Sequence, residues 1–179
     1  MSKFIKKLDD FFEMVKEAFK DPLEIQWIDK AGHLVGLFEI NDNVYQINCV
    51  EKENNIWKFD FYSVERKADS IVLSPDMTNR ERDKFRVLPT VLVGLEYLVL
   101  QKSPEAIILG AADSSKGRKK LYASFLEDFC LKIDYKFYTK VYQTSEDITS
   151  TKQLFVLYKE GGDIDKLYST IISSIEDEK

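Results

Sequence analysis

The chain has 179 residues, of which 44% are hydrophobic and 13% aromatic, so it can bury a sizeable core as one domain. Its 31 acidic and 26 basic residues give a formal net charge of -5, which argues against broad electrostatic binding to nucleic acid or to a membrane surface. The two cysteines, Cys49 and Cys130, form neither a CxxC pair nor a cluster with the single histidine. No zinc site and no disulfide framework are therefore expected.

The N-terminal residues 1–20 carry apolar side chains at spacings of three and four, which predicts an amphipathic helix. Asp21-Pro22 should end it, because the residue before a proline disfavours the helical conformation. There is no signal-peptide h-region. The most apolar stretch, residues 87–100, is about 14 residues long, whereas a membrane span needs roughly 20. We expect a cytoplasmic protein without a membrane partner.

From Leu23 the apolar pattern becomes alternating, and it predicts strands over residues 25–28, 34–40, 44–50 and 56–64. The breaks at residues 29–32, 41–43 and 53–55 contain Gly, Asn and Asp, which tolerate a positive φ in tight turns. Short turns of this kind join antiparallel neighbours. The first half of the chain is therefore predicted to be an antiparallel meander.

Residues 65–84 form the most polar passage of the chain. Within it, residues 71–73 are interpreted either as a short edge strand or as an anchor that pins the connection to the core. Long connections in compact domains are often functional, so this passage is a candidate interaction loop.

The second half predicts helices alternating with strands. Pro89 either begins a helix that runs to about residue 101 or kinks a longer helix that starts near residues 78–79. Residues 106–110 are apolar on both faces, as expected of a central strand parallel to one neighbour. A second helix, strands over residues 135–142 and 154–158, and a C-terminal helix over residues 163–177 follow, the last with Asp163 as its N-cap.

This order resembles the GNAT acetyltransferase superfamily, in which a meander leads into a helix, a central strand, a second helix and a closing hairpin. The segments that carry the resemblance are residues 106–110, 118–122, 137–142 and 154–158. The resemblance implies an α/β (α+β) fold with a mixed, mostly antiparallel sheet flanked by helices. We expect a single domain over residues 1–179, with the N- and C-terminal helices appended.

In GNAT enzymes the pyrophosphate of acetyl-CoA binds backbone amides in a glycine-containing loop before the helix that follows the meander. Here the corresponding residues 74–88 contain no glycine, so no cofactor is expected, and acetyl-CoA is the alternative. Tyr122 resembles the tyrosine that protonates the departing thiolate in many GNAT enzymes. The other interpretation is that Tyr122 packs against the sheet, and no catalytic residue is then present.

The loop of residues 110–120 is the best local candidate for a binding site. It follows the predicted central strand, where open α/β sheets tend to bind ligands, and it places Lys116, Gly117, Arg118, Lys119 and Lys120 at the start of a helix. Cations oppose the helix dipole there, and a bound phosphate or an acidic partner would relieve that repulsion. The spacing does not match a P-loop, and a solvated basic turn capped by Ser114 or Ser115 remains the alternative.

The other polar candidates have simple interpretations. His33 is expected to be a surface turn residue, and Glu39 and Asp60 lie in strands where acetyltransferases can place a general base, or are solvated. The sequence contains no metal motif and no catalytic triad.

The order also resembles degenerate GNAT-like proteins that bacteriophages and some bacteria encode. This resemblance implies a non-catalytic interaction protein, either associated with the virion or interacting with the host, that binds another protein or a second copy of itself. An acyl-CoA-dependent N-acyltransferase is the alternative, and a nucleic acid is the least expected partner.

Overall fold

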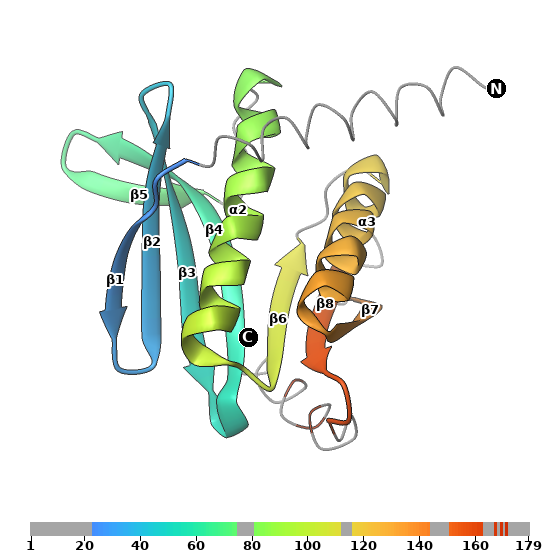
Figure 1. Ribbon diagram of the computed structural model, residues 1–179. Coiled ribbons are helices and arrows are strands. Elements are labelled where there is room, and N and C mark those ends of the chain that lie inside the picture. The colour runs from blue at the N-terminus through green and yellow to red at the C-terminus, as the bar shows by residue number, and fades with distance from the viewer. Residues whose placement is uncertain are drawn as a thin grey trace. The chain divides into compact units, whose positions relative to one another are not determined.

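The computed structural model describes residues 23–74, 81–111, 116–143 and 151–162, together with Leu167, Ser169 and Ile171 (Figure 1). The chain divides into two compact units. One comprises residues 1–29, 35–47 and 61–97, and the other comprises residues 30–34, 48–60 and 98–179. The predicted N-terminal helix over residues 1–20 lies outside the described residues. The expectation of a single domain stays a prediction.

The described strands form one mixed sheet of eight strands in the order β1-β2-β3-β4-β6-β8-β7, with β5 paired to β4 outside this path. The strands are β1 Gln26–Lys30, β2 His33–Ile40, β3 Asn43–Lys52, β4 Ile56–Lys67, β5 Ser70–Ser74, β6 Ala106–Ala111, β7 Tyr135–Gln143 and β8 Thr151–Lys159. The helices within the described ranges are α2 Glu81–Lys102 and α3 Lys116–Ile133.

The turns of the meander have the backbone that their sequence predicts. Asn41 and Asp42 join β2 to β3 with φ of 49° and 63°, the pair of positive angles that a two-residue type I′ hairpin requires. Gly32 joins β1 to β2 with φ of 70°, and Asn54 and Asn55 precede β4 with φ of 60° and 57°. The antiparallel meander is therefore confirmed together with the reason for it.

The first unit packs α2 beside its strands (Figure 1). Phe38, Tyr45 and Phe61 form a row of stacked rings across β2, β3 and β4, with centroid separations of 5.3 and 6.2 Å. Trp27 stacks on Tyr97 of α2 at 4.3 Å and 8°. Aromatic side chains thus join the helix to the strands, as their large apolar area allows.

Pro89 lies inside α2, so of the two predicted helices the longer one is correct. Residues 87–92, Leu95 and Leu98 are buried, which agrees with a core helix that is apolar nearly all round. Proline removes one backbone donor from a helix. One residue later, the buried Thr90 hydroxyl donates to the carbonyl oxygen of Arg86 at 2.8 Å.

The second unit is built around β6. This strand is parallel to β4 and antiparallel to β8, and both of its faces are buried, with Ala106, Ile107 and Ile108 at most 3% exposed. The prediction of a central strand parallel to one neighbour is confirmed. On one face, Ile108 packs in a cluster with Ile56, Ala106, Leu154, Val156 and Ile171.

The connection from α2 to β6 is fixed by several hydrogen bonds within the second unit. Ser103 has a positive φ of 45°, and its carbonyl oxygen accepts from Asn55 Nδ2 at 3.1 Å and from Lys159 Nζ at 2.9 Å. The Tyr135 hydroxyl donates to the carbonyl oxygen of Pro104 at 2.6 Å. The carbonyl oxygen of the buried Pro104 is thereby satisfied, as buried backbone groups require.

Of the predicted C-terminal helix, the structure describes Leu167, Ser169 and Ile171, and all three are helical. Ile171 is 4% exposed in the cluster around Ile108, and Leu167 packs against the same cluster. Leu167 and Ile171 therefore contribute to the apolar packing on this face of β6.

The α/β class, the mixed and mostly antiparallel sheet, and the order of meander, helix, central strand, helix and closing hairpin agree with the GNAT-like fold expected from the sequence. No helix in the described ranges is long and apolar enough to cross a bilayer.

Candidate functional site

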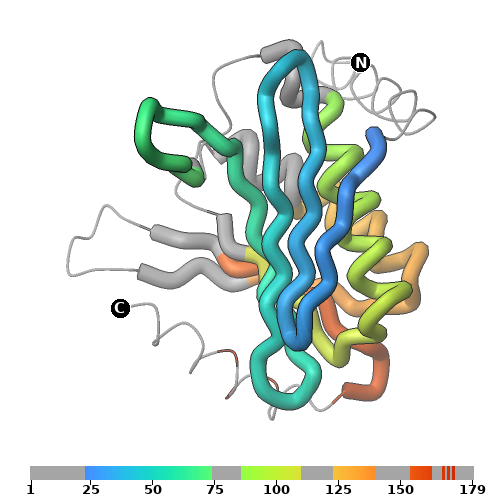
Figure 2. The backbone as a smooth tube through the Cα atoms, turned by 90° about the vertical axis from the view of Figure 1, so that its left-hand side faces the viewer, coloured from blue at the N-terminus to red at the C-terminus, as the bar shows by residue number. Residues whose placement is uncertain are grey.

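The end of β4 and the whole of β5 form a two-stranded arm, which we define as residues 63–74. The strands pair antiparallel from Ser63 opposite Ser74 to Lys67 opposite Ser70, and Ala68 and Asp69 make the turn. In Figures 1 and 2 the closed end of the arm projects away from β2 and β3. Of the two interpretations of residues 71–73, the edge strand is correct.

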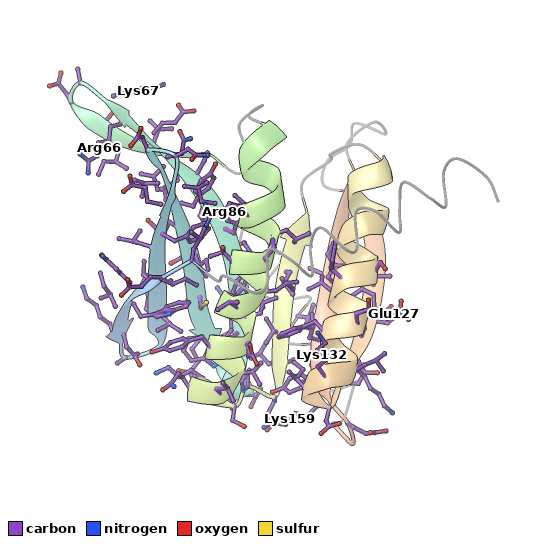
Figure 3. All side chains as sticks on the ribbon, turned by 45° about the horizontal axis from the view of Figure 1, so that its top comes forward. Arg66, Lys67, Arg86, Glu127, Lys132 and Lys159 are labelled. Atoms are coloured by element: carbon purple, nitrogen blue, oxygen red, sulfur yellow. The ribbon has the colours of Figure 1, made fainter. Side chains whose placement is uncertain are left out.

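The two faces of the arm differ in composition. Directly opposed residues share a face, so Val64 and Leu73 lie on the same face as Arg66 and Ile71. Ile71 is 69% exposed and Leu73 is 41% exposed. Figure 3 shows Arg66 near the closed end of the arm. One face of the arm therefore presents an exposed apolar pair with a cation beside it.

The outer edge of β5 is open within the part of the chain that the structure describes, where β5 pairs with β4 alone. Its sequence, Ser-Ile-Val-Leu-Ser, contains neither charge nor proline. Natural edge strands are commonly protected by lysine, proline or a bulge, because an open edge is a template for another strand. By its chemistry, β5 can accept an added strand.

The predicted basic site lies at the start of α3, which begins at Lys116 and has no acidic residue in its first turn. Gly117, Arg118, Lys119 and Lys120 belong to the same first turns, and Tyr122 follows in the helix. The helix start is thus where the sequence predicted it. The side chains of these residues lie outside the described part, so anion binding and the role of Tyr122 stay predictions.

The carboxyl end of β6 lies just before this basic segment. The parallel pairing with β4 runs from Ile56 opposite Ala106 to Phe59 opposite Leu109. In the described pairing, Gly110 and Ala111 continue opposite Leu154 and Gln153 of β8 only. The ladder between the two parallel strands therefore ends at Leu109, although β4 continues to Lys67. It ends close to the carboxyl end of β6, the end of a strand at which open α/β sheets bind ligands.

The acidic candidates are dispersed over the strands. Glu39 is exposed on β2. Oδ2 of Asp60 on β4 forms an ion pair with Nζ of Lys58 at 3.3 Å. Within the described residues no group of three or more His, Cys, Asp or Glu side chains could hold a metal ion. Neither carboxylate belongs to such a cluster.

The prediction that His33 lies in the turn is wrong. The turn ends at Gly32, and His33 is the first residue of β2. Its Nε2 is hydrogen-bonded to Oδ1 of Asn48 on β3. The short turn leaves His33 within the hairpin, so its ring makes a cross-strand contact.

The two cysteines are poor nucleophiles. Burial, followed by the nearby charge of Asp60, raises the pKa of Cys49 from 9.0 to about 12, and burial followed by the charge of Glu127 raises that of Cys130 equally. The reactive form of cysteine is the thiolate, which these environments suppress at neutral pH. Both cysteines are free and buried, as predicted.

Sequence reasoning found the strand in residues 71–73 but missed the arm. It ended the preceding strand at Val64, whereas β4 continues to Lys67. The alternation of Ser63, Val64, Glu65 and Arg66 was the available signal, but the charges of residues 65–67 masked it. Recognising the hairpin required the pairing partner as well.

No protein-family model matches the chain, and no curated protein matches its sequence. Among solved structures it is similar to the ribosomal-protein-S18-alanine N-acetyltransferase from Escherichia coli, at 12% identity over 75% of each chain with a TM-score of 0.42. It is also similar to a GNAT-family protein from Desulfovibrio desulfuricans, at 11% identity over 72% of this chain and 69% of that chain, with a TM-score of 0.38. Because both scores lie below 0.5, the function is argued from the residues of this chain.

Proposed function

We propose that this chain is a non-catalytic interaction protein that binds another protein chain through strand addition to β5 of the arm. The observation that supports this proposal best is the exposure of Ile71 and Leu73, 69% and 41%, on a strand whose outer edge is open in the described part of the chain.

Covering this surface would be favourable for two reasons. Fully burying an isoleucine or leucine side chain contributes about 1.5–3 kcal/mol, and Ile71 retains most of its exposure in the isolated chain. An added strand would also pair the outer backbone groups of β5, which gives affinity through main-chain hydrogen bonds. Arg66 beside the apolar pair would favour an acidic group at the rim of a partner.

The two outermost strands of the described sheet, β1 and β7, have a different composition. β1 contains Asp29 and Lys30, and β7 contains Lys136 and Lys140. Charged side chains of this kind discourage edge-to-edge pairing. β5 lacks them, so its edge is suited to association.

A photoreactive benzophenone amino acid at position 71 tests the proposal in an extract of the native source. Position 100 is the matched control, because Leu100 on α2 is 73% exposed, similar to Ile71, but does not lie on a strand. We expect a discrete cross-linked product from position 71 and none from position 100. Equal yields at the two positions, or no product at position 71, would contradict the proposal.

The second candidate is an acyl-CoA-dependent N-acyltransferase. The end of the β4–β6 ladder at Leu109, just before the basic segment, supports it. Gly110 and the basic start of α3 would then lie toward the phosphates, with Tyr122 as the acid. Acetyl-CoA at 100 times its Kd would stabilise the protein by about 2.7 kcal/mol in a thermal-shift assay. No shift at millimolar acetyl-CoA would remove this candidate, and a Tyr122→Phe variant that keeps both the shift and turnover would remove that role for Tyr122.

We also propose that the protein is bacteriophage-encoded and virion-associated, because the order of its elements resembles that of degenerate GNAT-like proteins encoded by bacteriophages. Mass spectrometry of purified virions tests it directly. The protein should be present at a fixed copy number per particle, and its absence from particles that contain all other structural proteins would refute the proposal.

A further inference from the structure

The sequence of β5 is nearly symmetric about its centre. Reading from Ser70 to Ser74 gives Ser-Ile-Val-Leu-Ser, so a serine lies at each end, a branched aliphatic residue lies on each side, and Val72 is central. A strand of this kind presents almost the same side chains when its direction is reversed. It is therefore complementary to a copy of itself in the antiparallel orientation.

We propose that the partner of the arm is a second copy of this chain, with the two β5 strands paired antiparallel about a two-fold axis at Val72. This inference rests on the proposed interaction function and names its partner. Isologous contacts of this type are the commonest in protein oligomers, because a two-fold axis closes the assembly. The two arms would form a four-stranded sheet in the order β4-β5-β5-β4.

The register places apolar residues opposite one another. Ile71 would face Leu73 of the second copy, and Leu73 would face Ile71 of that copy, on the face that exposes both residues at present. Since Val64 is opposite Leu73 and Arg66 is opposite Ile71 within each arm, six aliphatic side chains would lie together, with one Arg66 from each copy at the outer side of the group. The exposed pair would become the centre of the interface.

The other face is compatible with the same register. Val72 would face Val72 of the second copy, flanked on each side by Glu65, which lies opposite Val72 in its own arm. Ser74 would be paired with Ser70 of the second copy, so no charged residue is introduced at either end of the pairing. No two like charges are directly opposed between the two β5 strands, a juxtaposition that would destabilise the pairing.

Neighbouring registers are less suitable. With the axis at Ile71, Asp69 would face Leu73 and Ala68 would face Ser74, which places a carboxylate against the apolar pair. The symmetry of the pairing requires the axis to pass through a residue, because hydrogen-bonded and non-hydrogen-bonded pairs alternate along the strands. Val72 is the centre that pairs all five residues of β5.

The interface is small. The five residues of β5 are far fewer than the roughly 20–30 residues a side of a standard interface. The association is therefore expected to depend on concentration in the isolated protein.

Sedimentation equilibrium tests the dimer with the full-length chain. The weight-average mass of the wild type should rise toward twice that of the monomer as the concentration approaches about 1 mM. A Val72→Lys variant should remain monomeric because it sets two ammonium groups opposite each other, whereas Leu100→Lys, which adds the same charge at an exposed position of α2, should behave as the wild type. A wild type that stays monomeric, or a Val72→Lys variant that still dimerises, would overturn the inference.

Cysteine cross-linking tests the register. Under mild oxidation Val72→Cys should form an intermolecular disulfide with itself. Ile71→Cys should not, because its own copy lies diagonally about 7–8 Å away, beyond the Cβ separation of about 3.5–4.5 Å in disulfides. Mixing Ile71→Cys with Leu73→Cys should restore the cross-link. The native cysteines are buried and do not compete.

Two outcomes separate the inference from the function on which it rests. If position 71 cross-links to a different protein while the wild type stays monomeric and Val72→Cys reacts no faster than Leu100→Cys, the interaction function holds and the second copy is wrong. If position 71 cross-links to nothing in the extract and the isolated chain is monomeric, both are wrong.

Discussion

Gly36 on β2 provides a strict test of the packing in the first unit. A Cβ atom at this position would lie 2.7 Å from Cζ3 of Trp27 and 2.9 Å from Cγ2 of Ile25. The indole cannot move freely, because Trp27 is stacked on Tyr97 at 4.3 Å. The Gly36→Ala substitution must therefore displace both the Ile25 side chain and an aromatic ring that is stacked on Tyr97.

The magnitude follows from two opposing terms. Overpacking a well-packed site destabilises by about 1–3 kcal/mol, whereas replacing glycine in a strand by alanine favours folding by roughly 0.5–1 kcal/mol. The expected net loss is about 0–2.5 kcal/mol. For a chain of this length, that corresponds to a fall in Tm of up to about 10 °C.

Urea and thermal unfolding of four proteins measure the effect: the wild type, Gly36→Ala, Trp27→Leu and the double variant. A smaller side chain at position 27 removes the contacts with the indole but leaves Cγ2 of Ile25 at 2.9 Å. Gly36→Ala should therefore be less destabilising in the Trp27→Leu background than in the wild type. The coupling energy should lie in the range of about 0.5–3 kcal/mol that contacting residues show. If Gly36→Ala alone raised the stability, or if the two effects were additive, the close approach of Gly36 and Trp27 would be wrong.

Three further predictions concern single groups. Tyr135→Phe removes the donor to the Pro104 carbonyl and should lower the unfolding free energy by about 1–3 kcal/mol in urea. The folded thiols of Cys49 and Cys130 have pKa values raised from 9.0 to about 12. Their reaction with an aromatic disulfide at pH 8 should therefore be slow until urea is added, and their contribution to stability, present below pH 9, should be lost as the pH rises toward 12. If a Cys49→Ala, Cys130→Ala double variant lost as much stability as the wild type between pH 9 and pH 12, this assignment would be wrong. Asp42→Gly should raise the Tm, because residue 42 has a φ of 63° in a type I′ turn, and a lower Tm would contradict it.

Local chemistry made most of the fold predictable. Asn41, Asp42 and Gly32 adopt the positive φ that their residue types tolerate, and these turns fix the meander because short connections leave one way to pair. The alternation of Tyr45, Ile47 and Cys49 gave a face that is at most 1% exposed. These are properties of neighbouring residues, which a single sequence contains.

Pairing between distant segments could not be predicted in the same way. Several apolar strands offer similar edges, and nothing local in β6 specifies that β8, and not β7, lies beside it. The choice between a helix that begins at Pro89 and a longer helix that contains it also depended on packing. The helix α2 continues through the proline, and Val87 and Leu88, which precede it, are already buried. Tertiary contacts decided these features.

For the candidate sites, the sequence predicted where the segments lie in the fold but not what they bind. The basic segment was placed correctly at a helix start, at Lys116. For the arm, the sequence predicted the strand at residues 71–73 but not its pairing with β4. The exposure of Ile71 could not be predicted either, because it depends on which other parts of the fold lie against this strand. Sequence patterns report which residues can be buried, whereas a binding surface is defined by apolar residues that the fold leaves exposed.

The two proposed functions place different requirements on the chain, and this makes them separable. Acyl transfer would depend on the carboxyl end of β6 and on the basic start of α3, and it gives no reason for Ile71 to be 69% exposed. Strand addition at β5 needs neither Gly110 nor Tyr122. Because a fold hosts many unrelated functions, the decision rests on the sites. If Val72→Lys abolishes association but keeps the rise in Tm with acetyl-CoA, the chain has two independent sites. If Val72→Lys abolishes association and acetyl-CoA does not change the Tm of the wild type, the arm is the functional element.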